Sequence, residues 1–176
     1  MKSKYYNIIS ITSLFFGIVM GYVLNLQFIS GNYIDLSFKD NFNIYKMNFQ
    51  IALFVKIIFK NLIVALLLSI GGYFSSGILT IVVLITNGFY LGSYFISYHY
   101  SNISLLEFAY YFIFHGIIEF YAFFMFCKIG YRGFNFYYNM IKKDLFKIDI
   151  KFSDFVTPIF ILTIAALIET FLISNF

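Results

Sequence analysis

The chain has 176 residues, of which 61% are hydrophobic and only 11% are charged. Soluble domains average about 45–50% apolar and about 25% charged residues, and a small domain cannot bury so large an apolar excess. The composition therefore excludes an ordinary soluble enzyme, a disordered tail and a disulfide scaffold, and predicts an all-α, polytopic membrane protein. The net charge of +4 comes from cations beside apolar runs, which attract anionic lipid, so nucleic-acid binding is not predicted.

Five apolar segments are long enough to cross a bilayer, which takes about 20 residues per helix. They cover residues 6–29, 49–74, 77–99, 104–128 and 154–175. Lys56 and Lys60 interrupt the second segment, so two interpretations are open. It is either one long tilted span, or an interfacial helix at about 47–59 followed by a short span at 61–74. Apolar residues at helical spacing before Lys60 favour the second interpretation in part.

The lysine and arginine counts of the loops set the orientation. The N-terminal tail carries Lys2 and Lys4 and has no small-residue cleavage site, which predicts an uncleaved anchor. Six cations lie in or at the start of the loop 129–153. Five spans place both basic segments in the cytoplasm and the C-terminus outside. Cysteines introduced at 132–147 should react only from the cytoplasm, and cysteines near Ser37 only from outside.

The loop 129–153 also has an amphipathic pattern. Apolar residues form one helical stripe, with the lysines mostly off it: Phe134, Tyr138, Ile141, Leu145 and Ile148. This pattern is typical of a short helix that lies in the cytoplasmic headgroup layer. The functional alternative is a docking face for a cytoplasmic partner.

A polar pair lies within the fourth span, where charged groups are costly and usually face the protein interior. His115 and Glu119 are one turn apart and share a helix face. A zinc site needs three or four ligands, and only His99 and Cys127 offer further ones nearby, so no metal is predicted. We interpret the pair as a buried hydrogen-bonding cluster that fixes helix packing, with a proton relay as the alternative. No phosphate-binding loop or nucleophile elbow occurs, so we expect no catalytic residue, no enzyme activity and no cofactor.

Helix rise predicts partners for the other polar residues in the spans. It places Asn87 and His115 at a similar depth, roughly 16 Å below the outer edge. We therefore expect the two side chains to face each other within reach of a hydrogen bond or of one water.

The two carboxylates of the spans have different predicted depths. Glu119 should lie roughly 22 Å from the outer edge and Glu169 roughly 8 Å, so they should have separate partners. Lys60 and Asn61 begin the short second span. We expect Lys60 to approach Glu169 and to tie the second span to the fifth. The alternative is that Lys60 reaches the outer headgroups and Glu169 is protonated.

Glycines in the spans follow the small-x-x-x-small spacing, which lets helices approach closely. Five are assigned to helix packing: Gly17, Gly21, Gly88, Gly92 and Gly116. Three more, Gly71, Gly72 and Gly77, bracket a tight turn between the second and third spans.

Three motifs in sequence order resemble a known family. They are "NGFYLG" at 87–92, "HGIIE" at 115–119 and "AALIET" at 165–170. Together, over about residues 61–175, they resemble the stage II sporulation protein M family of integral membrane proteins. The resemblance implies a helical membrane protein with no established catalytic activity.

The family resemblance implies two kinds of function. One branch scaffolds peptidoglycan-degrading partners during engulfment in endospore formation. Another accompanies circular bacteriocin systems, beside an ABC ATPase, and serves secretion and self-immunity. The sporulation branch lacks the His-Gly…Glu motif, which this chain carries at His115, Gly116 and Glu119, with Phe114 where a proline often precedes the histidine. The resemblance therefore favours the bacteriocin branch.

We expect a non-enzymatic membrane subunit whose spans bind or pass a compact apolar peptide and whose loop 129–153 docks an ABC ATPase. A scaffold for cell-wall hydrolases and a proton-coupled carrier that uses Glu119 are the alternatives. Besides the lipid bilayer, the ATPase and the peptide, a second copy of the chain is a candidate partner. Neighbouring genes separate the first two functions, because a bacteriocin precursor and an ATPase indicate export and sporulation genes indicate the scaffold.

Overall fold

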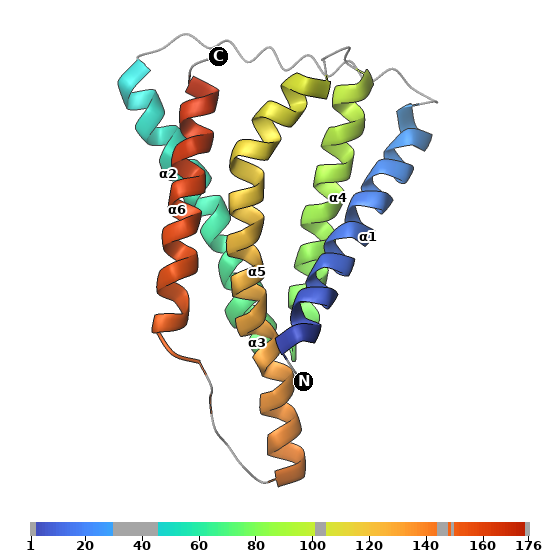
Figure 1. Cartoon of the computed structure of the whole chain (residues 1–176), viewed down its shortest axis with the longest axis vertical. Coiled ribbons are helices and arrows are strands. Elements are labelled where there is room, and N and C mark those ends of the chain that lie inside the picture. The colour runs from blue at the N-terminus through green and yellow to red at the C-terminus, as the bar shows by residue number, and fades with distance from the viewer. Residues whose placement is uncertain (1–2, 30–45, 101–104, 144–147, 149, 175–176) are drawn as a thin grey trace.

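A computed structural model describes residues 3–29, 46–100, 105–143, 148 and 150–174, which are helical throughout apart from short connections and contain no strand. The elements in order are α1 (Ser3–Ile29), α2 (Lys46–Leu66), the π-helix η1 (Leu67–Gly71), α3 (Gly72–Phe74), α4 (Ile78–Tyr100), α5 (Leu105–Lys143) and α6 (Ser153–Ser174). Figure 1 shows a bundle in which α1 begins at one end and α6 finishes at the other. Every described element is a helix, and four described stretches are long and apolar enough to cross a membrane, so the all-α polytopic architecture is confirmed.

Four stretches of the described chain are long and apolar enough to cross a membrane: Tyr5–Leu26, Gln50–Phe74, Ile78–Ser97 and Ser153–Ser174. The side chains of residues 105–114, at the start of α5, lie outside the described part. The crossing by α5 therefore stays a prediction. Ser37, chosen as an external labelling site, also lies outside the described residues.

The second span is one continuous helical pass made of α2, η1 and α3. The helix is unbroken at Lys60, so the division into an interfacial helix and a short span is wrong. Figure 1 shows α2 running obliquely across the bundle to reach α3 near the start of α1. Lys56 and Lys60 are exposed, and long lysine stems can carry an ammonium along an apolar surface to water. Two lysines at the periphery of a tilted helix therefore do not force it to end.

The turn from α3 to α4 is closed by its own side chains. The Ser75 hydroxyl accepts a hydrogen bond from the Leu79 backbone N–H at 2.9 Å and donates to the Gly72 carbonyl at 3.2 Å. Ser76 and Gly77 both have positive φ, of 57° and 89°. Glycine adopts this left-handed conformation without a Cβ clash, which explains Gly77 in the turn just before α4.

α1 and α4 pack with their backbones in close contact. Four glycines lie in this contact: Gly17, Gly21, Gly88 and Gly92. A methyl group added at Gly17 would collide with the carbonyl oxygen of Ile85, and one added at Gly88 with the carbonyl oxygen of Leu14. Side-chain volume on either helix would therefore separate the two backbones.

A second close crossing joins η1 and α4 to α5. The Thr80 hydroxyl donates to the Leu68 carbonyl at 2.8 Å, and a Cβ at Gly130 would collide with both groups. This crossing borders the core of the bundle, in which Leu68, Phe123 and Leu162 are fully or almost fully buried. These three side chains come from η1, α5 and α6, so the core holds these elements together.

Residues 129–143 are the last part of α5 and are named the α5 extension here. The prediction of a separate helix is wrong for these residues, because they continue α5 and project past the other helices (Figure 1). Leu145 of the predicted stripe lies outside the described residues, and contact with the headgroup layer stays a prediction. Tyr137 donates to the Phe74 carbonyl at 2.9 Å, and Asn135 donates to the Tyr6 hydroxyl at 2.7 Å. Contacts with α3 and α1 therefore hold the base of the extension in line with α5.

Candidate functional site

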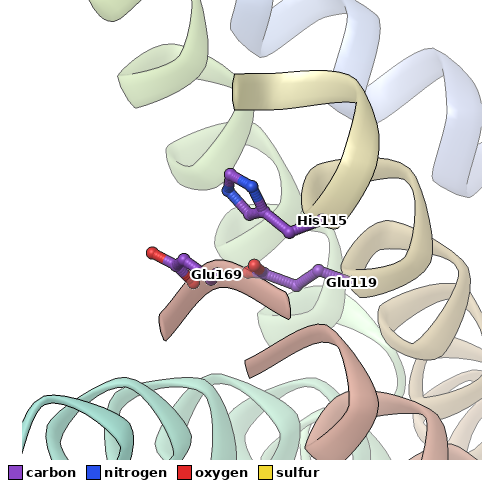
Figure 2. Close-up of side chains that lie close together, drawn as sticks. All are labelled: His115, Glu119 and Glu169. Carbon is purple, nitrogen blue, oxygen red and sulfur yellow. The ribbon is translucent and has the colours of Figure 1, made fainter. Parts of the chain in front are cut away.

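Three ionisable side chains from two helices converge inside the bundle. His115 and Glu119 project from α5 and Glu169 from α6, and Figure 2 shows the three side chains close together between the two helices. One ligand atom of each, an imidazole nitrogen or a carboxylate oxygen, lies within 4.8 Å of those of the other two. All three residues are half-buried, and Gly116 next to His115 is buried. The cluster therefore links α5 to α6 through polar groups.

The prediction that Glu119 and Glu169 have separate partners is wrong. It assumed that α5 and α6 run straight from a common outer edge. By helix rise, Glu119 lies about 21 Å from the start of α5 and Glu169 about 8 Å from the end of α6, a difference of about 13 Å. The first turns of α5 curve towards α4 and take up part of this difference (Figure 1). The sequence gives no signal for that curve.

Asn87 does not make the predicted direct bond to His115. Its side-chain amide donates to the Val83 carbonyl of its own helix at 2.8 Å. His115 Nδ1 is buried and has no hydrogen-bond partner. Asn87 therefore satisfies its donor within α4, and the histidine belongs to the carboxylate cluster.

Lys60 lies within electrostatic range of both Glu119 and Glu169 but makes no direct ion pair with Glu169. Its side chain is exposed, as expected for a lysine that reaches towards the headgroups. α2 and α6 are nevertheless in contact, and Asn61 places its side chain beside Glu119. The second span thus reaches the cluster through Asn61.

An ion pair at the other end of the bundle was absent from the sequence predictions. Arg132 of α5 pairs with Asp154 in the first turn of α6, and Asp154 also accepts from the Lys151 backbone N–H at 3.2 Å. Asp154 sits at the N-terminus of a helix, where an acidic residue is favoured, so this position was recognisable in the sequence. The pair positions α6 against the base of the α5 extension.

The His115–Glu119–Glu169 cluster has three chemical capacities. Two adjacent carboxylates can share a proton, an imidazole can exchange one, and the three groups together can coordinate a cation. No nucleophile with an adjacent base is found among the described residues of the cluster.

The chain was compared with known proteins in three ways. The family model described as stage II sporulation protein M matches residues 9–173, nearly the whole chain. The search of curated proteins found no match, and the search of solved structures found none either.

Proposed function

The chain belongs to the stage II sporulation protein M family, and on that basis we propose that it is a non-enzymatic membrane subunit that works with a cytoplasmic ABC ATPase. Its role would be bacteriocin secretion or producer self-immunity, with the spans contacting a compact apolar peptide. The His-Gly…Glu motif at 115–119 supports the bacteriocin branch over the sporulation branch.

The α5 extension carries the ATPase part of this proposal. Ile141 lies about 14 Å past Arg132 by helix rise, and Arg132 marks the level at which α6 begins. Phe134, Tyr138 and Ile141 form a stripe along the extension and are exposed, Ile141 by 76%. An apolar stripe that projects beyond the bundle fits a groove in a protein partner better than it fits lipid.

The base of the stripe is ordered by neighbouring rings and charges. The Phe134 and Tyr138 rings stack with centroids 6.5 Å apart, and the Lys142 ammonium lies over the Tyr138 ring at 5.3 Å. Ordered aromatic groups lose little side-chain entropy when they bind, and a basic rim favours an acidic groove. These features support a helix-in-groove contact with the ATPase.

Co-expression tests the proposal. The tagged chain is produced with the ABC ATPase encoded beside its own gene, and co-purification and producer survival are measured. Ile141→Asp should weaken co-purification about 30-fold, which corresponds to losing an apolar anchor worth about 2 kcal/mol, and should sensitise the producer. Ile148→Asp is the matched control, because Ile148 is 61% exposed and lies beyond the end of α5.

Two results would contradict the proposal. One is an Ile141→Asp chain that binds the ATPase and protects the producer as well as wild type. The other is an Ile141→Asp chain that no longer associates with liposomes but still binds the ATPase like wild type. That result would show that the stripe contacts lipid. Co-purification with cell-wall hydrolases at the engulfing septum would instead support the scaffold.

A further inference from the structure

Two buried nitrogen atoms beside the carboxylate cluster lack hydrogen-bond partners. They are Asn61 Nδ2 and His115 Nδ1. Asn61 is only 7% exposed, and its side chain lies next to the Glu119 carboxylate. Buried polar groups in folded proteins are nearly always satisfied, and an exception points to a water or an ion. Both exceptions at this level of the bundle lie around the same three ionisable groups.

The donor set suits a small cation. Zn²⁺ in a tetrahedral site has imidazole and carboxylate ligands at about 2.0–2.2 Å, which places its ligand atoms about 3.4 Å apart. The ligand atoms of His115, Glu119 and Glu169 already lie within 4.8 Å of one another. Small rotations about side-chain bonds close the remaining gap. A water supplies the fourth ligand.

The charge balance favours a divalent metal ion over the Lys60 ammonium as the partner of the two carboxylates. When both are ionised, Glu119 and Glu169 bring two negative charges into an apolar bundle, where uncompensated charge is costly. Lys60 can offset one of these charges and makes no ion-pair contact with Glu169. A divalent ion offsets both, and the imidazole selects a first-row transition metal over Mg²⁺ or Ca²⁺.

We propose that His115, Glu119 and Glu169 bind one divalent transition-metal ion, Zn²⁺ in particular, and thereby clamp α5 to α6. The site is separate from the α5 extension and does not depend on an ATPase partner. Two ligands one turn apart on α5 set its orientation, and the third from α6 makes binding depend on helix packing. Asn61 adds α2 to the site as a neighbour of the ligands.

Metal binding is tested on the full-length chain, purified in detergent with a tag that lacks histidine, stripped with EDTA and titrated with ZnCl₂. Elemental analysis should give one Zn²⁺ per chain after dialysis. Co²⁺ in place of Zn²⁺ should give the visible absorption bands of a four-coordinate ion. Loss of an outer partner of a metal typically costs about 10–100-fold in affinity, so His115→Ala and Glu169→Gln should each cost more than about 100-fold.

Asn61→Ala should fall within the 10–100-fold range of an outer partner. His99→Ala is the matched control, because it removes the other histidine, which is exposed on α4, and should bind Zn²⁺ like wild type. Misfolding is separated from ligand loss by thermal unfolding. Zn²⁺ should raise the melting temperature of wild type and leave that of Glu169→Gln unchanged, while the metal-free forms melt at similar temperatures.

Two outcomes would overturn the proposal. The first is a wild-type chain that retains no Zn²⁺ and gives no Co²⁺ absorption bands. The second is a Glu169→Gln or His115→Ala chain that binds Zn²⁺ as tightly as wild type. Either outcome would rule out a metal clamp at these three residues.

Discussion

Replacement of Gly17 by alanine should loosen the contact between α1 and α4. A Cβ at Gly17 would lie 3.0 Å from the Ile85 Cα and closer still to its carbonyl oxygen, whereas ordinary contact begins at 3.4 Å. Alanine in a helix is favoured over glycine by about 1 kcal/mol. Overpacking against a rigid neighbour costs about 1–3 kcal/mol, and here the neighbour is backbone that cannot rotate away. We therefore expect a net loss of up to about 2 kcal/mol in the free energy of unfolding.

The measurement is reversible unfolding in mixed micelles, followed by helical circular dichroism. Gly71→Ala is the matched control, because its new Cβ would collide only with the end of the flexible Leu79 side chain and would meet the Leu66 carbonyl at ordinary contact distance, so its stability should change little. Gly88→Ala should behave like Gly17→Ala. The double variant should lose less than the sum of the two, because one methyl group already separates the helices. A Gly17→Ala chain at least as stable as wild type would refute the close backbone contact.

Three further predictions follow from other contacts. Thr80→Val removes the hydroxyl that bonds a carbonyl of η1 and should lower the unfolding free energy by about 0.6–1.7 kcal/mol; equal stability would show that this bond is dispensable. Asp154→Asn breaks the pair with Arg132, in which the Asp154 side chain is 23% exposed and the Arg132 side chain 31%. It should lower the unfolding free energy by less than about 1 kcal/mol, and 1 M salt should abolish this loss. A salt-independent loss would contradict an electrostatic origin. In a chain whose buried cysteine is replaced by serine, Ile148→Cys should be labelled only from the cytoplasm and Tyr100→Cys only from outside, and the reverse pattern would invert the proposed orientation.

The number and order of the helices could be predicted because apolar length is a property of the sequence alone. The predicted division of the second span at Lys60 was wrong for a physical reason, since a tilted helix can carry exposed lysines at its periphery. The prediction of a separate helix at the α5 extension failed because amphipathic spacing predicts a helix but not its direction. In the structure it continues α5, and the contacts of Tyr137 with Phe74 and of Asn135 with Tyr6 hold it in that direction.

The candidate site was predictable in its residues and not in its geometry. The spacing of His115 and Glu119 fixes a shared face on one helix, so that pair could be found from the sequence. Glu169 joins them from α6, and depth measured along straight helices misplaced it, in part because the first turns of α5 curve. The third potential metal ligand was therefore missing from the sequence analysis, and no metal was predicted.

The five-residue π-helix η1 lets one membrane pass serve two sets of neighbours. Before it, α2 packs on α6, and after it, α3 packs on α5 and α4. A π turn carries one more residue than an α turn, which rotates every later side chain by about 100° around the helix axis. Deletion of a single residue between Leu67 and Gly71 would thus turn Tyr73 off α5 while leaving the hydropathy profile of the span almost unchanged. Relatives of this chain that differ by one residue in length here would consequently assemble differently.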